Sequence, residues 1–263
     1  MSSSSILFER VGGVAKITLN RPDVLNSFNT AMSQELQGVL REVAAAPELR
    51  AVYLTGAGRA FCAGQDLAEA APPGGQPLAD FAAHVRRSYN PLIRAIRHLE
   101  KPVVCAVNGV AAGAGANLAL ACDLVFAAEE ASFLQAFVNI GLVPDTGGTW
   151  FLPRLVGLAQ ASAMMILGER VLARRAFELG MVYQVVPLAS LEAVAWGVAQ
   201  RLATQPTFGI GLTKRLLNAS LESTLEQQLE AEAEHQGMAG RSADYAEGVQ
   251  AFLQKRKPAF RGA

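Results

Sequence analysis

The chain has 263 residues, enough for one large domain or for one domain with an appendage. Lysine plus arginine number 23 and aspartate plus glutamate number 23, so the net formal charge is zero. This balance, without a basic block, disfavours nucleic acid or an anionic membrane as a partner. The 3 cysteines lack Cys-x-x-Cys spacing, and the first residues are a serine run without a sustained apolar segment. We therefore expect a cytoplasmic protein with reduced, buried thiols, a frayed end at residues 1–5 and no signal peptide.

Strand and helix patterns alternate through the first 150 residues. Gly12-Gly13 lies between two apolar runs and predicts a hairpin, whereas apolar residues recur at helical spacing after Asn29. The predicted elements are strands at 6–10 and 14–19, a helix from Asn29, a strand at 51–55, a helix at 78–99 that is bent at Asn90-Pro91, and strands at 103–107, 123–127 and 132–135. Residues 68–77 are rich in alanine, proline and glycine, and we expect a mobile loop there.

Beyond Trp150 the pattern becomes helical, with predicted helices at 158–167, 174–179, 188–203, 208–218, 224–236 and 244–254. Strands that alternate with helices indicate an α/β fold with both faces of the sheet covered. We place an α/β core with the functional site at residues 1–200 and a helical C-terminal region at residues 201–263. The three histidines are far apart in the sequence, so we expect structural or solvated roles for them and no metal site.

A glycine-rich loop follows the predicted strand at 103–107. Gly113 and Gly115 precede a run of alanine and leucine, which predicts a loop that leads into a tightly packed helix. Small residues let a ligand approach the backbone, and unpaired N–H groups at a helix start can receive an oxyanion. The alternative is that they only let the helix pack against a sheet. Leu118 stands where the dinucleotide fingerprint needs its third glycine, so a nicotinamide site is disfavoured.

Four segments together resemble the crotonase (enoyl-CoA hydratase/isomerase) superfamily: residues 21–26, 61–67, 108–115 and 141–149. The resemblance covers nearly the whole chain. It implies a spiral of strand–strand–helix units, a helical C-terminal region that assembles a trimer or a dimer of trimers, and an acyl-CoA thioester substrate. It implies no cofactor beyond the CoA of the substrate.

The resemblance also assigns site residues. The backbone N–H groups of Gln65 and Ala114 are expected to hold the thioester oxygen, and Lys257 in the tail is expected to contact CoA in its own or a neighbouring subunit. The other expected CoA or substrate contacts are Asn26, Ala63, Gln65, Asp66, Leu67 and Gly113. Two preorganised N–H donors stabilise an enolate oxygen, and loss of one such donor costs about 10²–10³ in rate in measured enzymes.

The acid–base carboxylate is the remaining requirement. The positions that match the two glutamates of family hydratases are Asn117 and Phe137, so ordinary hydration is disfavoured. Asp145 matches the position that dienoyl-CoA isomerases and dehalogenase relatives use. Apolar neighbours such as Ile140 and Val143 would raise its pKa and make it a stronger base. The alternative role for Asp145 is to cap a helix that starts near Thr149.

The resemblance narrows further, to the branch of the superfamily that isomerises ring epoxides in bacterial phenylacetate degradation. Its motifs recur at residues 62–67, 108–116, 148–150, 203–209 and 239–249. It implies conversion of 1,2-epoxyphenylacetyl-CoA to oxepin-CoA, or a shift of a 3,4 double bond to the 2,3 position. Two alternatives stay open: an enoyl-CoA hydratase of broad specificity that uses Asp145, and a non-catalytic RNA-binding protein of this fold, which the neutral charge disfavours.

Overall fold

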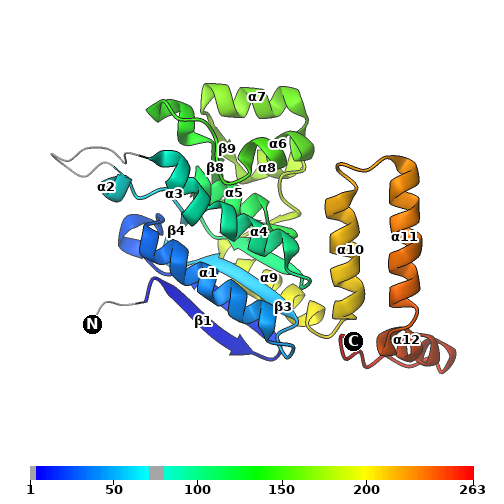
Figure 1. Cartoon of the computed structure of the whole chain (residues 1–263). Helices are drawn as coiled ribbons and strands as arrows, with labels where there is room; N and C mark the ends of the chain where they lie inside the picture. The colour runs from blue at the N-terminus through cyan, green and yellow to red at the C-terminus, as the bar shows by residue number, and fades with distance from the viewer. Residues whose placement is uncertain (1–3, 71–79) are drawn as a thin grey trace.

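The computed structural model describes residues 4–70 and 80–263, and it has two sheets joined by helices (Figure 1). The larger sheet has six strands in the order β1-β2-β3-β5-β7-β10 and the smaller has the order β4-β6-β8-β9. Only the β1–β2 and β8–β9 pairs are antiparallel among the described strands. The strands of the larger sheet are β1 (Ile6–Val11), β2 (Val14–Leu19), β3 (Ala51–Gly56), β5 (Val103–Val107), β7 (Leu124–Ala128) and β10 (Gln184–Val186); those of the smaller are β4 (Ala60–Cys62), β6 (Val110–Ala112), β8 (Ser132–Leu134) and β9 (Arg170–Leu172).

The chain repeats one unit as it winds between the sheets. In β3–β4, β5–β6 and β7–β8, the first strand enters the larger sheet, the second enters the smaller, and helical structure follows. The spiral of strand–strand–helix units and the α/β class are therefore confirmed. The helices are α1 (Thr30–Ala45), α2 (Leu67–Ala70), α3 (Phe81–Ser88), α4 (Asn90–His98), α5 (Ala114–Leu120), α6 (Gly148–Val156), α7 (Leu158–Leu167), α8 (Ala173–Glu178), α9 (Leu188–Leu202), α10 (Thr207–Ala219), α11 (Leu225–Ala239) and α12 (Ala243–Leu253), with 3-10 turns η1 (Pro22–Val24) and η2 (Ala136–Ile140).

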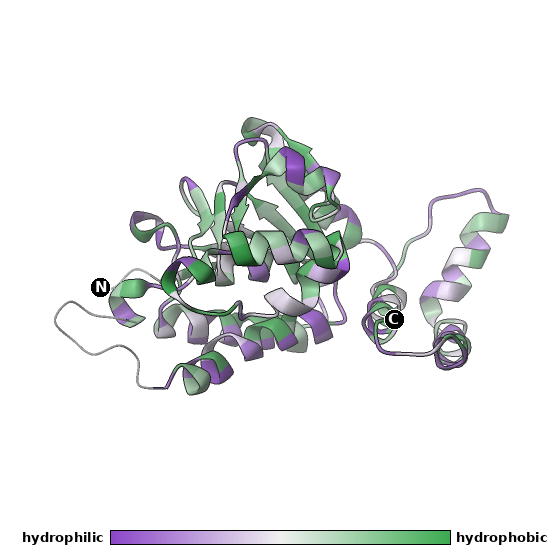
Figure 2. Ribbon diagram, turned by 90° about the horizontal axis from the view of Figure 1, so that it is seen from above, coloured by the Kyte–Doolittle hydropathy of each residue, from purple (hydrophilic) through white to green (hydrophobic). Residues whose placement is uncertain are grey.

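Apolar spacing explains why the core forms. Every residue of β5 is buried, as expected for a strand inside a covered parallel sheet. Helix α1 begins at the Asn29 cap, whose side chain accepts from the Met32 N–H, and it buries Met32, Leu36, Leu40 and Val43. Figure 2 shows this apolar interior, and the three cysteines lie within it as free, buried thiols, as predicted. In the described part of the chain, no helix is long and apolar enough to cross a bilayer.

The single bent helix predicted at 78–99 is instead two helices, α3 and α4, that meet at Tyr89. Pro91 has no N–H to donate to the carbonyl of Arg87, and that carbonyl accepts from Gln37 Nε2 at 2.9 Å. The neighbouring carbonyl of Ser88 accepts from Ser33 Oγ at 2.6 Å. Side chains of α1 thus donate hydrogen bonds to the backbone carbonyls that lack a helical partner where α3 ends and α4 begins.

Other predictions differ from the structure in short segments. Strands β4, β6, β9 and β10 are absent from the predicted elements because three residues rarely show a period, although β8, which is equally short, is predicted at 132–135. The loop expected at residues 68–77 begins inside α2, and its part from residue 71 lies outside the described residues. The same holds for residues 1–3 of the end that we expect to be frayed.

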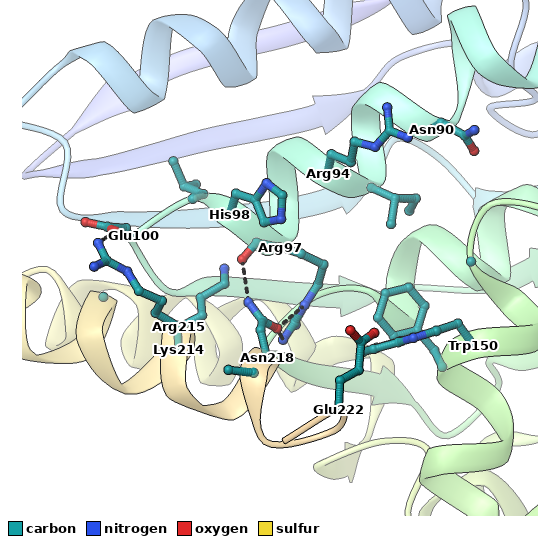
Figure 3. Close-up of a pocket in the computed structure, with 16 residues that line it drawn as sticks. Asn90, Arg94, Arg97, His98, Glu100, Trp150, Lys214, Arg215, Asn218 and Glu222 are labelled. Atoms are coloured by element: carbon teal, nitrogen blue, oxygen red, sulfur yellow. Dashed lines mark hydrogen bonds and ion pairs between the residues drawn. The ribbon is translucent and has the colours of Figure 1, made fainter. Parts of the chain in front are cut away.

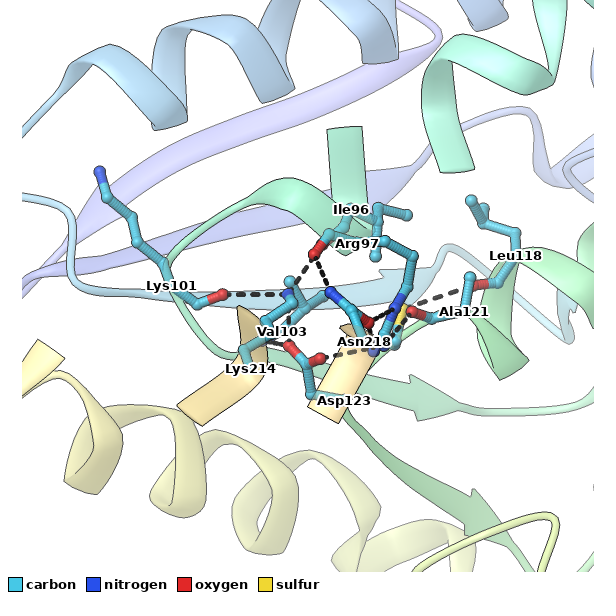
Figure 4. Close-up of polar contacts among 10 residues, drawn as sticks. Ile96, Arg97, Lys101, Val103, Leu118, Ala121, Asp123, Lys214 and Asn218 are labelled. Carbon is cyan, nitrogen blue, oxygen red and sulfur yellow. Dashed lines mark hydrogen bonds and ion pairs between the residues drawn. The ribbon is translucent and has the colours of Figure 1, made fainter. Parts of the chain in front are cut away.

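The C-terminal helices α10, α11 and α12 extend away from the two sheets (Figure 1). A partly buried ion cluster holds α10 against the core (Figure 4): Lys214 Nζ lies 2.7 Å from Asp123 Oδ2 and donates to the Ile96 carbonyl at 2.7 Å. Asp123 also accepts from Arg97 at 3.1 Å and from the Val103 N–H at 2.8 Å. Asp123 therefore has a structural role ahead of β7. Residue 200, our predicted boundary, lies in the last turn of α9.

Candidate active site

A cavity of about 530 Å³ lies where the loops after β4 and β6 meet the segment after β8. Six of the residues singled out from the sequence line it: Ala63, Gln65, Leu67, Gly113, Ala114 and Asp145. The rest of the wall is mainly apolar and includes Phe81, Phe137, Ile140 and Leu142. A concave, mostly apolar pocket with a few polar groups is the usual form of a small-molecule site.

Two glycines let the loops after β4 and β6 touch. Gly64 has φ of +92°, and a Cβ there would lie 2.8 Å from the Ala112 carbonyl oxygen. A Cβ on Gly115 would lie 2.3 Å from the carbonyl oxygen of Cys62. Any side chain at either position would force the loops apart. The glycines thus bring Gln65 and Ala114 to the same wall of the cavity.

The main-chain N–H groups of Gln65 and Ala114 are both available. Phe28 pairs with Gln65 as in a parallel sheet, through Phe28 N–H to Gly64 O at 2.6 Å and Asp66 N–H to Phe28 O at 2.8 Å. The N–H of Gln65 itself therefore points to the other side of the loop. Ala114 is the first residue of α5, where no intrahelical acceptor exists. Within residues 4–70 and 80–263, neither N–H donates a hydrogen bond.

Asp145 lies in the turn before α6. Its Oδ1 accepts from Thr146 Oγ1 at 2.7 Å, and the cap residue of α6 is Gly147, with no side-chain cap. The alternative that the Asp145 carboxylate caps this helix is therefore wrong. Burial raises the pKa of Asp145 above its ordinary value, and this outweighs the opposing effects of the Thr146 hydrogen bond and the nearby His84. A carboxylate with a raised pKa is suited to accept a proton.

The two positions that match hydratase glutamates have other roles. Asn117 is fully buried, accepts from Gln135 Nε2 at 2.8 Å and donates to the carbonyl of Asp145 at 2.8 Å. Phe137 forms part of the apolar wall. Among the described residues that line the cavity, Asp145 is the sole carboxylate.

Three predicted contact residues do not line the cavity. Asn26 is fully buried and bonds only main-chain groups, those of Arg21, Ala57 and Ala60, so it shapes the loop before β4. Asp66 pairs with Arg21 at 2.9 Å and accepts from the Ala68 N–H at 3.1 Å. Lys257 is exposed in the tail after α12, and Figure 1 shows α12 on the opposite side of the molecule from α3.

Two cavity residues were missed from the sequence. His84 on α3 is buried and hydrogen-bonded, which agrees with the structural and not the solvated role expected, and Tyr89 lies at the junction of α3 and α4. Both bond the side chain of Gln65: His84 Nε2 lies 2.8 Å from Gln65 Oε1, and the Tyr89 hydroxyl donates to the same oxygen. The sequence positions of His84 and Tyr89 do not indicate these hydrogen bonds, because the bonds depend on how α3 packs over the loop that carries Gln65.

A larger cavity of about 940 Å³ lies between α4, α6 and α10 (Figure 3). Arg215 pairs with Glu100 on its wall, and Arg97 and Lys214 pair with Asp123 behind it. Among the described residues on its wall there is none of the predicted catalytic, oxyanion or CoA-contact residues. The smaller cavity is therefore the better candidate for chemistry.

Known proteins resemble the chain over its full length. The family model for enoyl-CoA hydratase/isomerase matches residues 9–263. A 1,2-epoxyphenylacetyl-CoA isomerase of Escherichia coli (strain K12) is 52% identical over 250 residues, 95% of each chain. A probable enoyl-CoA hydratase of Rhodobacter capsulatus is 47% identical over 262 residues, 100% of each chain. The crystal structure of a putative enoyl-CoA hydratase/isomerase from Mycobacterium abscessus has a TM-score of 0.92 at 40% identity, and covers 98% of this chain and 100% of that chain.

The two-sheet spiral and the cavity at its crossing loops define a crotonase-type enzyme. The chain belongs to the enoyl-CoA hydratase/isomerase family, as its motifs predict. It is accordingly an acyl-CoA hydratase/isomerase.

Proposed function

We propose that the protein is an acyl-CoA isomerase in which Asp145 is the one acid–base group. The observation that carries this proposal is a cavity whose sole carboxylate, among its described lining residues, lies near two unengaged backbone N–H groups. Hydration requires groups that position and activate water, and Asn117 and Phe137 do not supply a base. A proton shift within the substrate requires only one carboxylate.

In the proposed mechanism the thioester oxygen accepts hydrogen bonds from the N–H groups of Gln65 and Ala114. Asp145 removes a proton from C2, and the two donors stabilise the enolate oxygen in a site with mainly apolar walls. The electron pair moves along the acyl chain, and Asp145 returns its proton to C4. The double bond thereby moves from the 3,4 to the 2,3 position without a cofactor. With the ring epoxide, the C–C bond shared by the epoxide and the six-membered ring first breaks to give the seven-membered oxepin ring, and the proton then passes from C2 to the ring carbon in the position of C4.

The proposed substrates are ring-1,2-epoxyphenylacetyl-CoA, which would give oxepin-CoA, and straight acyl-CoA thioesters with a 3,4 double bond. The relative from Escherichia coli that is named for the first of these is 52% identical. We place Ala63, Leu67 and Gly113 along the acyl-CoA path because they line the cavity. Lys257 would reach CoA only from a neighbouring subunit of the proposed oligomer.

Parallel assays with 3-enoyl-CoA and 2-enoyl-CoA test the proposal. We expect conjugation of 3-enoyl-CoA to increase the absorbance of the conjugated thioester, and little loss of that absorbance when 2-enoyl-CoA is supplied. Rapid loss with crotonyl-CoA would identify a hydratase, as the name of the Rhodobacter capsulatus relative suggests for that protein. A gel shift with RNA at physiological salt would support the non-catalytic alternative.

A further inference from the structure

The side chain of Gln65 is held in one orientation by three neighbours. Its Nε2 lies 3.3 Å from the main-chain carbonyl of Asp66, and its Oε1 faces both His84 and Tyr89. A backbone carbonyl only accepts hydrogen bonds, so the atom next to Asp66 must be the amide nitrogen. The amide oxygen therefore faces His84 and Tyr89.

This orientation fixes the donors around it. An amide oxygen only accepts, so Tyr89 donates its hydroxyl proton and His84 carries a proton on Nε2. Both donors are buried, with exposed fractions of 6% for His84 and 2% for Tyr89, and they line the cavity together with Gln65. Turning the amide over would place its oxygen against the Asp66 carbonyl oxygen, where neither atom can donate, at a free-energy cost typical of an unsatisfied contact.

One hydrogen of the Gln65 amide remains unused. Nε2 carries two hydrogens, and within residues 4–70 and 80–263 its one acceptor is the Asp66 carbonyl. Because Gln65 lines the cavity, the second N–H is available to a bound acyl group. The walls around it are mainly apolar, so an oxygen atom of that group would find few other donors.

We infer that Gln65, held by His84 and Tyr89, is a specificity-determining residue that selects acyl groups with an oxygen acceptor near C3. The inference rests on the proposed function, in which the backbone N–H of the same residue holds the thioester oxygen. A short side chain on that residue can reach the carbons next to the thioester but not the distal end of the acyl group. An epoxide or ether oxygen on the ring carbons nearest the thioester meets this requirement.

Matched pairs of unreactive ligands test the inference by isothermal titration calorimetry at pH 8. 2-Methoxy- and 2-ethylphenylacetyl-CoA differ by one oxygen near the thioester, and the 4-methoxy and 4-ethyl pair places the same difference at the far end. In the parent protein, the methoxy-over-ethyl preference should be about three- to tenfold larger for the 2-pair than for the 4-pair, the range of a single hydrogen bond.

Two variants keep the backbone N–H and change only the side chain. Gln65→Leu should make the preferences of the two pairs equal. Gln65→Glu still accepts from His84 and Tyr89 but presents an oxygen, so it should make the 2-methoxy ligand the weaker binder of its pair. Three results would overturn the inference. The parent protein could show the same methoxy-over-ethyl preference for both pairs, a folded Gln65→Glu variant could keep the parent preference, or all four ligands could fail to bind.

Turnover of 3-enoyl-CoA separates this inference from the proposed function. A straight 3-enoyl chain has no oxygen near C3, so its isomerisation by the parent protein does not depend on the contact proposed for the Gln65 side chain. Absent isomerisation with an intact ligand preference would refute the proposed function alone. Normal isomerisation with no ligand preference would refute the selection by Gln65 alone.

Discussion

The side-chain amide of Asn117 donates a 2.8 Å hydrogen bond to the main-chain carbonyl of Asp145. Asn117 lies on α5, three residues after Ala114, whose N–H is one of the two proposed oxyanion donors. The proposed base and one of the donors are thus held by the same short helix. Gln135 supports the arrangement from the other side, through its bond to Asn117 Oδ1.

Asn117→Asp should damage both the fold and the site. The substitution removes the donor to Asp145 and places a second buried carboxylate beside it, which raises the pKa of Asp145 further. We expect a loss of about 1–3 kcal/mol in the free energy of unfolding, as for an unsatisfied buried group. The pH below which kcat/KM falls should therefore increase. Urea unfolding and a pH–rate profile measure the two effects, and Gln135→Leu, which leaves the Asn117–Asp145 bond intact, should raise that pH less.

Thr146 adjusts the acidity of Asp145 directly. Its hydroxyl donates to Asp145 Oδ1 and opposes the rise in pKa that burial causes. Thr146→Val removes the donor, so the pKa of Asp145 should rise and a larger share of the base should be protonated at a given pH. The acidic limb of kcat/KM should therefore shift upward while the high-pH plateau changes little. Thr146→Ser keeps a hydroxyl and is the control; equal limbs in the Val and Ser variants would contradict the assignment.

The sequence predicts long, periodic elements well, because a buried helical face or an apolar strand is a local pattern. Helix α1, the β1–β2 hairpin and the C-terminal helices lie within a few residues of their predicted bounds. The break at Tyr89 is harder to predict, because Gln37 and Ser33 from another helix satisfy the carbonyls near Pro91. Three-residue strands such as β4 and β6 depend on partners elsewhere in the chain and show no local period.

The site residues likewise divide into those that the sequence predicts and those that it does not. Gln65, Ala114 and Asp145 carry motif signals, and the structure brings them to one cavity. Asn26 and Asp66 belong to the same motifs but bond neighbouring loops instead of lining that cavity, a distinction that spacing alone does not reveal. His84 and Tyr89 carry no motif, and only the packing of α3 over the Gln65 loop makes them part of the site.

The Ala114 N–H can be removed without a large change of backbone. Ala114 is the first residue of α5, a position that accepts proline, and it follows Gly113. Ala114→Pro should therefore fold and lower kcat by about 10²–10³. Gln65→Ala keeps its N–H and should cost far less in kcat, although His84 and Tyr89 lose their acceptor and stability should fall. An equal loss of kcat in both variants would mean that the Gln65 amide, and not the backbone, is the active group.

We expect the protein to form a trimer or a dimer of trimers. The C-terminal helices expose large apolar side chains, including Leu225 at 68%, Phe252 at 83% and Leu253 at 74%. Apolar surface of this kind is normally covered by another protein surface. Light scattering at micromolar concentration should give three or six times the chain mass of 27.8 kDa. A monomer mass would contradict the expectation, and Phe252→Asp with Leu253→Asp should lower the measured mass.

Asp145→Asn is the most direct test of the proposed base. Asparagine is nearly isosteric but cannot take a proton at neutral pH, so a contribution of about 10²–10⁴ to turnover should be lost. Acyl-CoA affinity should change little, because the proposed oxyanion contacts are backbone groups of other residues. Exchange of the C2 proton in heavy water should fall together with isomerisation of 3-enoyl-CoA. Exchange near the parent rate would show that another group removes the proton.

Thermal unfolding provides a second, independent measurement on the same variant. Burial raises the pKa of Asp145 in the folded state, so the stability contributed by its protonated form is present below the unfolded pKa and is lost as pH rises through the folded pKa. Asparagine carries no charge to bury. The unfolding temperature of Asp145→Asn at pH 8 should therefore equal or exceed that of the parent, and the difference should shrink toward pH 4. A variant that is inactive and also less stable at pH 8 would point to a structural role for the carboxylate, because the loss of activity would then follow from a disturbed fold.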